Sequence, residues 1–314
     1  MAADMLSGDR AIDALASLAE EPEKGRSSYW DLQLEKFQIS QDHALEGGTV
    51  LGNVSAKRDP FRKAALWVLQ TPLRLMGRKY RHFKKFAGLG RIIADRQERL
   101  YTEDVLRQVL SLAAIRDHLT WKNDRDLSVV IGDGLGVMAS LVRLACPGRK
   151  VVVVNLTKPL IADLVFLRKA LPDTHVAWAA SPRDMDQALG DPAIDVIAIR
   201  ADDARLLERA PVGLAINITS MQEMNLDVTE EYFKILRNSK GTRTFFYCCN
   251  KLSKTLPDGT ETRFRDYPWR QGDEILVDEA CKWFNVVSNT SPPFWIVKKF
   301  VTWHRFSVLE KDSK

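Results

Sequence analysis

Cysteine and long apolar runs are scarce in this chain, and their scarcity excludes several classes of protein. The 314 residues include four cysteines, none of them in a C-x-x-C pair: Cys146, Cys248, Cys249 and Cys281. This pattern predicts reduced, buried thiols and indicates neither a disulfide framework nor a zinc site. No uninterrupted apolar run reaches the roughly 18 residues of a membrane span, and residues 1–5 lack the basic flank and apolar run of a signal peptide. We therefore expect a cytoplasmic protein.

Metal-ligand spacings and internal repeats are also missing. The five histidines show no H-x-x-x-H pair, and we expect surface or structural roles for all of them: His43, His82, His118, His175 and His304. Four scattered carboxylates could form a metal site only if the fold brought them together: Asp195, Asp202, Asp203 and Asp227. The sequence therefore identifies no metal ligand and leaves open whether a divalent metal helps to position the acceptor.

The composition, 45% hydrophobic and 28% charged, is that of a globular protein with room for one doubly wound domain and an accessory region. We expect a flexible segment at 1–26, a helical, basic accessory region at 27–120, the main α/β domain at 121–305 and a tail at 306–314.

Positive charge is concentrated in the accessory region. Residues 57–99 contain thirteen Lys/Arg and three Asp/Glu, a local excess of ten charges. Such a segment could bind a nucleotide-linked sugar, an anionic lipid carrier or RNA, or could be a solvated helix face. Its apolar stretch at 61–76 could lie against a membrane interface, giving a peripheral membrane location, or pack on the main domain.

A glycine-rich turn follows an apolar strand in the middle of the chain. Residues 129–131 run into Gly132-Asp133-Gly134-Leu135-Gly136, and an apolar helix begins at once. Glycine permits positive φ and close approach of a ligand, and the helix start offers N–H groups to an adenosine-bearing molecule. Ala139 stands where the pyrophosphate fingerprint prefers its last glycine. The spacing predicts a cofactor loop of Gly132, Asp133, Gly134 and Gly136, favours S-adenosylmethionine over NAD, and has an ordinary βα turn as its alternative reading.

The next apolar strand, 150–154, ends at Asn155. Ligands of parallel sheets lie outside the carboxyl ends of the strands. A carboxylate usually grips the ribose hydroxyls there, and the Asn155 carbonyl can still accept one hydrogen bond. We therefore expect Asn155 to contact the ribose, with a plain turn residue as the alternative.

Strand and helix patterns alternate through the main domain. Strands are expected at 127–132, 150–155, one of 175–180 or 194–200, 213–218, 243–249, 274–278 and 294–301, and helices at 60–76, 79–97, 102–119, 137–145 and 159–171. This order predicts an α/β fold with a doubly wound, mostly parallel, seven-stranded sheet of Rossmann-like type and an N-terminal helical extension. The last two strands suit an antiparallel addition at the sheet edge.

A more specific pattern occurs at 215–224, where the strand Ala-Ile-Asn-Ile is followed by Thr-Ser-Met-Gln-Glu-Met. It resembles the sugar O-methyltransferase family of class I enzymes over residues 27–300. Other matching features are Tyr29-Trp30, the glycine loop, 160–168, Tyr232-Phe233, the aromatic strand 244–251 and Tyr267-Pro268-Trp269. The family has Asp and then proline after the second strand, where this chain has Asn155-Leu156-Thr157.

The resemblance implies S-adenosylmethionine as cofactor and methyl transfer to a hydroxyl of a sugar, whether nucleotide-linked, lipid-linked or in a glycan. Such a transfer is an in-line displacement that also requires removal of the hydroxyl proton. Glu223, just past a central strand, is the leading candidate for the base. It could instead complement a helix dipole or bind substrate hydroxyls.

The remaining candidate site residues follow the ends of central strands. Asn217 is expected to bind the cofactor, and the expected substrate contacts are Ser220, Gln222, Tyr247, Asn250 and Arg263. Ser220 is also a good N-cap, and Arg263 could equally form a surface ion pair.

Other readings keep the fold and change the function. The acceptor could be a small natural product or RNA, although no RNA-recognition module is evident. Asn155 in place of an acid favours a catalytically silent subunit that binds cofactor or partner. The glycine loop alone would also allow an NAD-dependent oxidoreductase.

Overall fold

A computed structural model describes residues 10–35, 60–119, 126–289, 291–298 and 301–312, with the backbone of two short strands, β1 (Gln38–Ile39) and β2 (Leu45–Glu46). Among the sequence-based expectations, His43, Lys57, Arg58 and most of the 46–52 loop lie outside the described residues.

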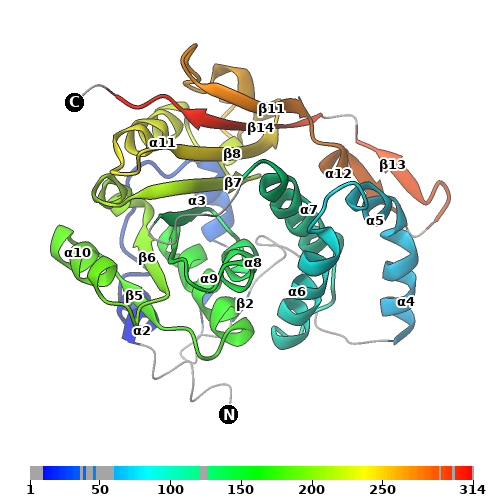
Figure 1. Cartoon of the computed structure of the whole chain (residues 1–314), viewed down its shortest axis with the longest axis horizontal. Coiled ribbons are helices and arrows are strands. Elements are labelled where there is room, and N and C mark those ends of the chain that lie inside the picture. Colours follow the sequence, from blue (N-terminus) through cyan, green and yellow to red (C-terminus); the bar gives the residue numbers. More distant parts are fainter. Residues whose placement is uncertain are drawn as a thin grey trace.

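The core of the molecule is an eight-stranded sheet in the order β11-β14-β8-β7-β3-β4-β6-β5 (Figure 1). The six strands from β8 to β5 are parallel, and β14 runs antiparallel between β8 and β11. In chain order the strands are β3 (Leu127–Ile131), β4 (Val151–Asn155), β5 (Val176–Trp178), β6 (Val196–Arg200), β7 (Val212–Ile218), β8 (Thr244–Lys251), β11 (Glu274–Ala280) and β14 (Thr302–Leu309). The doubly wound, mostly parallel α/β prediction is confirmed.

The prediction of seven strands is wrong by one. Only one of the segments 175–180 and 194–200 was expected to form a strand. Each of them forms one, because β5 pairs with β6 as an extra edge strand.

The last strand is also misplaced in the prediction. The apolar run 294–301 contributes β13 (Trp295–Val297) to a separate hairpin with β12 (Val286–Ser288). The sheet strand is β14, which extends into the segment expected to be a tail. Its side chains alternate between the sheet faces, so its sequence is less uniformly apolar than 294–301.

Helices cover both faces of the sheet. On one face lie α2 (Arg10–Ser17), α6 (Phe83–Arg96), α7 (Glu103–His118), α8 (Val137–Ala145) and α9 (Thr157–Ala170); on the other lie α10 (Pro182–Gly190), α11 (Leu226–Asn238) and the 3₁₀ segment η1 (Ala201–Arg209). Val129 and Val130 are neighbours in β3 but belong to opposite core clusters. This alternation explains why the central strands are apolar throughout.

The accessory helices share the core of the main domain. Phe86 of α6 and Val109 of α7 belong to the same buried cluster as Val130 and Ile216 of the sheet. The expected helix 60–76 divides into α4 (Pro60–Leu69) and α5 (Thr71–Gly77), with Pro72 in the first turn of α5. The helix expected at 79–97 begins only at Phe83.

The N-terminal segment differs from the expectation of a flexible tail. Ile12 and Leu15 of α2 are fully buried in the main core. The carboxylate of Glu23 accepts hydrogen bonds from the backbone N–H (2.7 Å) and hydroxyl (2.9 Å) of Thr157 at the start of α9. Residues 10–26 are therefore anchored to the main domain, a contact between distant parts of the chain that local composition cannot reveal.

Shorter elements complete the chain: α3 (Ser28–Leu34), the 3₁₀ turns η2 (Met221–Glu223) and η3 (Phe264–Asp266), the hairpin of β9 (Ser253–Thr255) and β10 (Glu261–Arg263), and α12 (Lys282–Asn285). Within the described ranges, every helix is too short or too polar to span a bilayer.

Candidate active site

The glycine loop between β3 and α8 has the backbone geometry that the sequence predicts. Gly132, Gly134 and Gly136 have φ of +70°, +93° and +62°. A Cβ on Gly132 would lie 2.1 Å from the hydroxyl oxygen of Ser220, and one on Gly136 would lie 2.5 Å from the backbone oxygen of Asp163. Only glycine satisfies both the torsions and these close approaches.

The carboxylate of Asp133 caps the helix that the loop opens. It accepts hydrogen bonds from the backbone N–H groups of Met138 (2.9 Å) and Ala139 (2.7 Å), and Val137 also donates to it. Burial raises the pKa of Asp133, and these donors oppose the rise. The N–H groups that a pyrophosphate would need are therefore already occupied by the chain's own anion.

Asn155, at the end of β4, is held by a second buried carboxylate. Its Nδ2 donates to Oδ2 of Asp163 at 2.9 Å, and its Oδ1 accepts the N–H of Leu156 at 3.0 Å. Asp163 is fully buried, and desolvation together with the nearby Asp133 raises its pKa well above the usual range. The amide is thereby oriented, and its carbonyl oxygen keeps one lone pair for a ligand.

The end of β7 carries backbone strain. Thr219 has φ of +56°, a left-handed conformation that is rare for a β-branched residue. Its N–H donates to the backbone oxygen of Cys249 at 2.7 Å, which fixes the turn against β8. The strained turn places Ser220 against Gly132 and leads directly into η2.

Glu223 of η2 belongs to a partly buried polar cluster. Its Oε1 accepts a hydrogen bond from Nζ of Lys254 at 2.8 Å, and the Tyr29 hydroxyl donates to its carboxylate. Nζ of Lys254 also lies 3.8 Å from the centre of the Tyr29 ring. Burial raises the pKa of Glu223 and lowers that of Lys254. Both shifts favour the neutral forms, so desolvation outweighs the attraction within the pair.

Two predicted contact residues support the strand ends instead of facing a ligand. Asn217 is fully buried; its Nδ2 donates to the backbone oxygen of Ile131 at 3.0 Å, and its Oδ1 accepts from Met221 and from Asn250. Asn250, equally buried, accepts the N–H of Gln222 at 3.1 Å. The prediction that they bind cofactor and substrate is corrected, because their amides join β3, β7, β8 and η2.

Three further predicted contact residues have protein partners in the structure. Gln222 is buried, and its Oε1 accepts the N–H of Lys251 at 2.8 Å. Tyr247 points to the other face of the sheet, where its hydroxyl lies 3.0 Å from Nδ1 of His304. Arg263 is exposed and forms an ion pair with Glu261 at 2.6 Å, the surface alternative.

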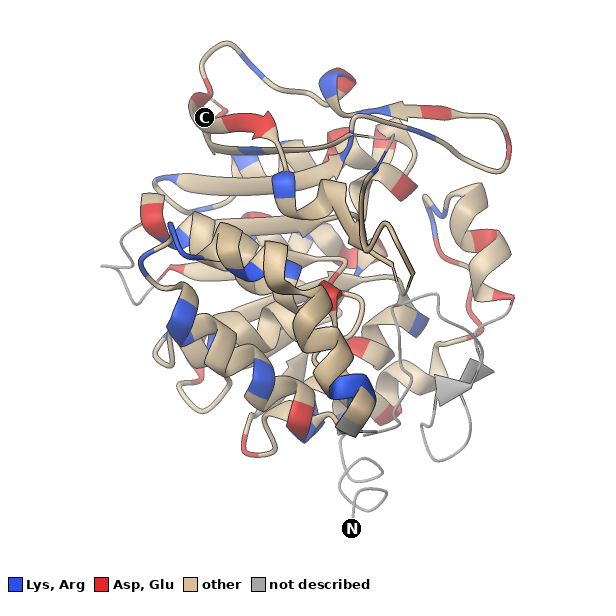
Figure 2. Ribbon diagram, turned by 90° about the vertical axis from the view of Figure 1, so that its right-hand side faces the viewer, with Lys and Arg blue, Asp and Glu red and all other residues tan. Residues whose placement is uncertain are grey.

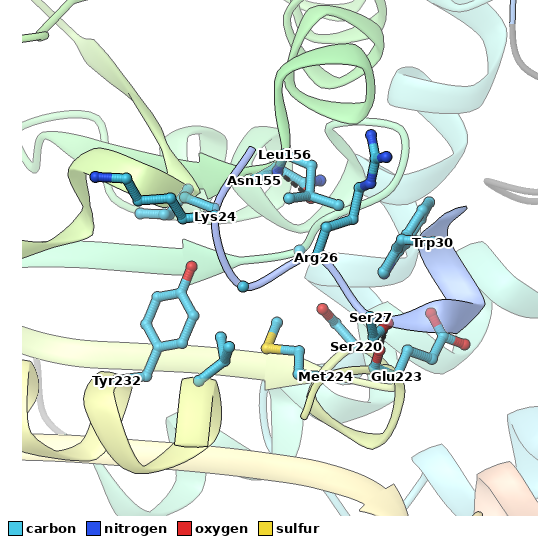
Figure 3. A pocket seen from close by; sticks show the side chains of 15 residues that line it. Lys24, Arg26, Ser27, Trp30, Asn155, Leu156, Ser220, Glu223, Met224 and Tyr232 are labelled. Atoms are coloured by element: carbon cyan, nitrogen blue, oxygen red, sulfur yellow. Dashed lines mark hydrogen bonds between the residues drawn. The ribbon is translucent and has the colours of Figure 1, made fainter. Parts of the chain in front are cut away.

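A cavity of about 60 Å³ brings four of the predicted residues together (Figure 3). Gly132, Asn155, Ser220 and Glu223 line it. In Figure 3 a segment of the N-terminal region, which we call the crossing segment (residues 24–27), runs between Asn155 and Leu156 on one side and Ser220 and Met224 on the other.

Contacts at both ends fix the crossing segment. Next to its start, Glu23 caps α9; at its end, the Ser27 hydroxyl donates to the backbone oxygen of Glu223. Lys24 also donates its backbone N–H to Asp202 at 3.2 Å.

Lys254, Ser27 and Glu23 are site residues that sequence reasoning missed. Ser27 and Glu23 are 196 and 134 positions from their partners, so no local spacing could reveal them. In this part of the chain, only the Tyr29-Trp30 pair matched the pattern of the sugar O-methyltransferase family.

No group of three or more His, Cys, Asp or Glu side chains suited to a metal ion occurs in the parts of the chain that the structure describes. Asp195, for example, pairs with Arg143.

Comparisons with known proteins give distant likenesses only. No family model and no curated protein matches the chain. Among solved structures, LepI in complex with SAM is 10% identical, with 98% of this chain and 86% of that one covered and a TM-score of 0.38. The methyltransferase CalO6 is 13% identical, with coverage of 97% and 91% and a TM-score of 0.37.

A Haemonchus contortus phosphoethanolamine N-methyltransferase in complex with S-adenosylhomocysteine is 12% identical, with coverage of 64% and 52% and a TM-score of 0.39. At these scores and identities the likenesses assign neither a family nor an activity to this chain.

Proposed function

We propose that this chain is an S-adenosylmethionine-dependent O-methyltransferase that acts on a sugar hydroxyl. The observation that carries the cofactor proposal is the capping of α8 by Asp133 beneath a loop of three positive-φ glycines. The loop geometry allows a nucleoside to approach the backbone, and the capped helix start disfavours a second anion such as the pyrophosphate of NAD. A sulfonium cofactor carries no such anion.

The residues around the loop fit an adenosyl group. The backbone of Gly132 and Gly134 would lie along it, and the oriented carbonyl of Asn155 would accept a hydrogen bond from a ribose hydroxyl. When bound, the cofactor supplies an electrophilic methyl group.

The cavity of about 60 Å³ is smaller than the roughly 300–1,000 Å³ of sites for drug-sized ligands. The crossing segment therefore has to move, or open on its Ser27 side, when a cofactor enters.

Glu223 is the residue we propose for removing the hydroxyl proton. Its burial raises its pKa toward neutrality, which makes it a stronger base than an exposed carboxylate. Lys254 and Tyr29 hold the carboxylate in place, and Lys254 limits the rise of its pKa. The sugar acceptor rests on the resemblance of 215–224 to the sugar O-methyltransferase family.

Incubation with methyl-labelled S-adenosylmethionine and a panel of nucleotide sugars, lipid-linked sugars and glycans tests this function. We expect label in a base-stable ether on at least one sugar, and a much lower rate of labelling with the Glu223→Gln variant. Label on RNA or on a small natural product, with none on any sugar, would overturn the acceptor class. No transfer to any acceptor and no cofactor binding would favour the silent subunit.

A further inference from the structure

Helix α4 is an apolar helix that the described part of the chain leaves exposed. Seven of its ten residues are Phe, Ala, Leu, Trp or Val, and none of residues 61–69 is buried. Phe61 is 86% exposed, Trp67 60% and Val68 53%. Helices with apolar residues on every side normally lie inside a protein or a membrane, so this exposure calls for an external partner.

A second exposed apolar segment adjoins α4. Around β13, the four consecutive residues Phe294, Trp295, Ile296 and Val297 are 42–72% exposed. The indole N–H of Trp295 donates to the backbone oxygen of Leu69, at the end of α4, at 2.8 Å. Helix α4 and residues 294–297 therefore form one continuous surface, which we call the aromatic face. Figure 1 shows α4 and β13 along the same side of the molecule.

Basic side chains are abundant in α4 and in the segment that follows it. Residues 60–85 contain eight Lys/Arg and no Asp/Glu. Seven of the eight are exposed: Arg62, Lys63, Arg78, Lys79, Arg81, Lys84 and Lys85. The eighth, Arg74, lies with its guanidinium 4.3 Å from the centre of the Trp67 ring. Figure 2 turns this side toward the viewer, and its front helices carry more Lys and Arg (blue) than Asp and Glu (red).

We propose that the aromatic face docks this protein on an anionic membrane surface. Exposed Trp and Phe rings insert at the boundary between headgroups and acyl chains, and Lys and Arg beside them attract anionic lipids. A protein partner would place its most buried contacts where charges are depleted. Here Arg62 and Lys63 lie within α4, and the Arg74 guanidinium lies against the exposed Trp67 ring. This proposal does not depend on the methyl-transfer reaction.

Flotation of the full-length protein with lipid vesicles tests the proposal. We expect binding to vesicles of phosphatidylcholine mixed with phosphatidylglycerol, little binding to phosphatidylcholine alone, and weakening as salt is raised. The double variant Trp67→Asp, Val297→Asp should bind at least roughly tenfold more weakly, because it removes inserted apolar area. Lys63→Glu with Arg78→Glu should lose the preference for anionic lipid.

Ile275→Asp provides the matched control. Ile275 is 52% exposed on β11, outside the aromatic face, so its replacement should leave flotation unchanged. Unchanged melting temperatures would show that the variants fold. Absence of flotation with anionic vesicles at low salt, or equal flotation of wild type and the Trp67/Val297 variant, would overturn the proposal. The wild type could instead form a concentration-dependent dimer, which the Trp67/Val297 variant abolishes, and fail to bind vesicles. That result would assign the aromatic face to a second copy of the chain and would also overturn the membrane proposal.

Discussion

The side-chain amide of Asn155 donates to the buried carboxyl group of Asp163 at 2.9 Å, so the residue at the end of β4 is fixed by the side chain beneath it. An aspartate at position 155 would lose the amide N–H that donates to Asp163 and would place a further carboxyl group beside it. Asp133 already raises the pKa of Asp163. This arrangement gives a physical reason for an amide where the family pattern has an acid.

Asn155→Asp should therefore destabilise the protein, by about 2–4 kcal/mol above neutral pH, because it places like charges together in a buried site. The loss should shrink at acidic pH, where one carboxyl of the pair binds a proton. Denaturant unfolding at two pH values measures both effects.

The exchanged pair Asn155→Asp, Asp163→Asn should recover most of that stability, because the hydrogen bond re-forms with donor and acceptor reversed. Equal stability of wild type and Asn155→Asp above neutral pH would contradict this account of position 155.

The pH dependence of stability offers a separate test of Asp163. Its pKa in the folded protein is raised above the unfolded value, so the folded state binds the extra proton. Its contribution is fully present below the unfolded pKa and is lost as pH rises through the folded pKa. Asp163→Asn should therefore flatten the fall in unfolding free energy across that window. A variant whose pH profile matches that of wild type would argue against the raised pKa.

Replacement of Glu223 should affect turnover more than cofactor affinity. We expect Glu223→Gln to lower kcat by roughly 10²–10⁴-fold, the usual contribution of a general base. Glu261→Gln, at an exposed carboxylate of the neighbouring hairpin, should leave kcat unchanged.

The acidic limb of the rate profile should report the pKa of Glu223. Activity should fall as pH drops through that raised pKa, and Lys254→Met should move the fall to higher pH, because Lys254 lowers the pKa. Initial rates across pH measure this shift, and an unmoved limb would exclude Glu223 as the group titrated.

The anchor of the crossing segment should control cofactor entry. Glu23→Ala removes both hydrogen bonds to Thr157 and should speed association of S-adenosylhomocysteine, measured by stopped-flow fluorescence of Trp30 in the cavity wall. Glu35→Ala, at the exposed end of α3, is the control. Identical association rates for Glu23→Ala and wild type would show that the segment does not limit entry.

Relief of the strain at Thr219 should stabilise the protein. Asparagine tolerates positive φ better than a β-branched residue, so Thr219→Asn should gain about 1 kcal/mol, whereas Thr219→Val should gain nothing. Thermal unfolding compares the two, and equal melting temperatures would mean that the turn stores no such strain.

The sequence was sufficient for local structure that depends on a short, continuous segment. The three glycines, Asp133, Asn155 and Glu223 all lie at the carboxyl edge of the sheet, because strand, turn and helix signals there are local. Which way a side chain faces within a strand was harder to predict. Asn217, Asn250 and Tyr247 follow or end strands as expected, but their side chains bond within the core or to its far side.

Contacts between distant segments were beyond sequence reasoning. Residues 10–26 read as a polar tail, yet Ile12 and Leu15 pack under α9, and Glu23 and Ser27 reach the site. Strand β14 was missed because the adjacent run 294–301 is more apolar, although the side chains of residues 294–298 and 301 are exposed.

Calorimetric titration of the purified protein with S-adenosylhomocysteine, with NAD as the comparison ligand, tests the central claim most directly. We predict binding of S-adenosylhomocysteine without binding of NAD, lost in Gly134→Arg and kept in Gly259→Arg, a positive-φ glycine with open space beside it. Failure of the folded wild type to bind S-adenosylhomocysteine, or equal binding by the Gly134→Arg variant, would contradict the assignment of the glycine loop as the cofactor site.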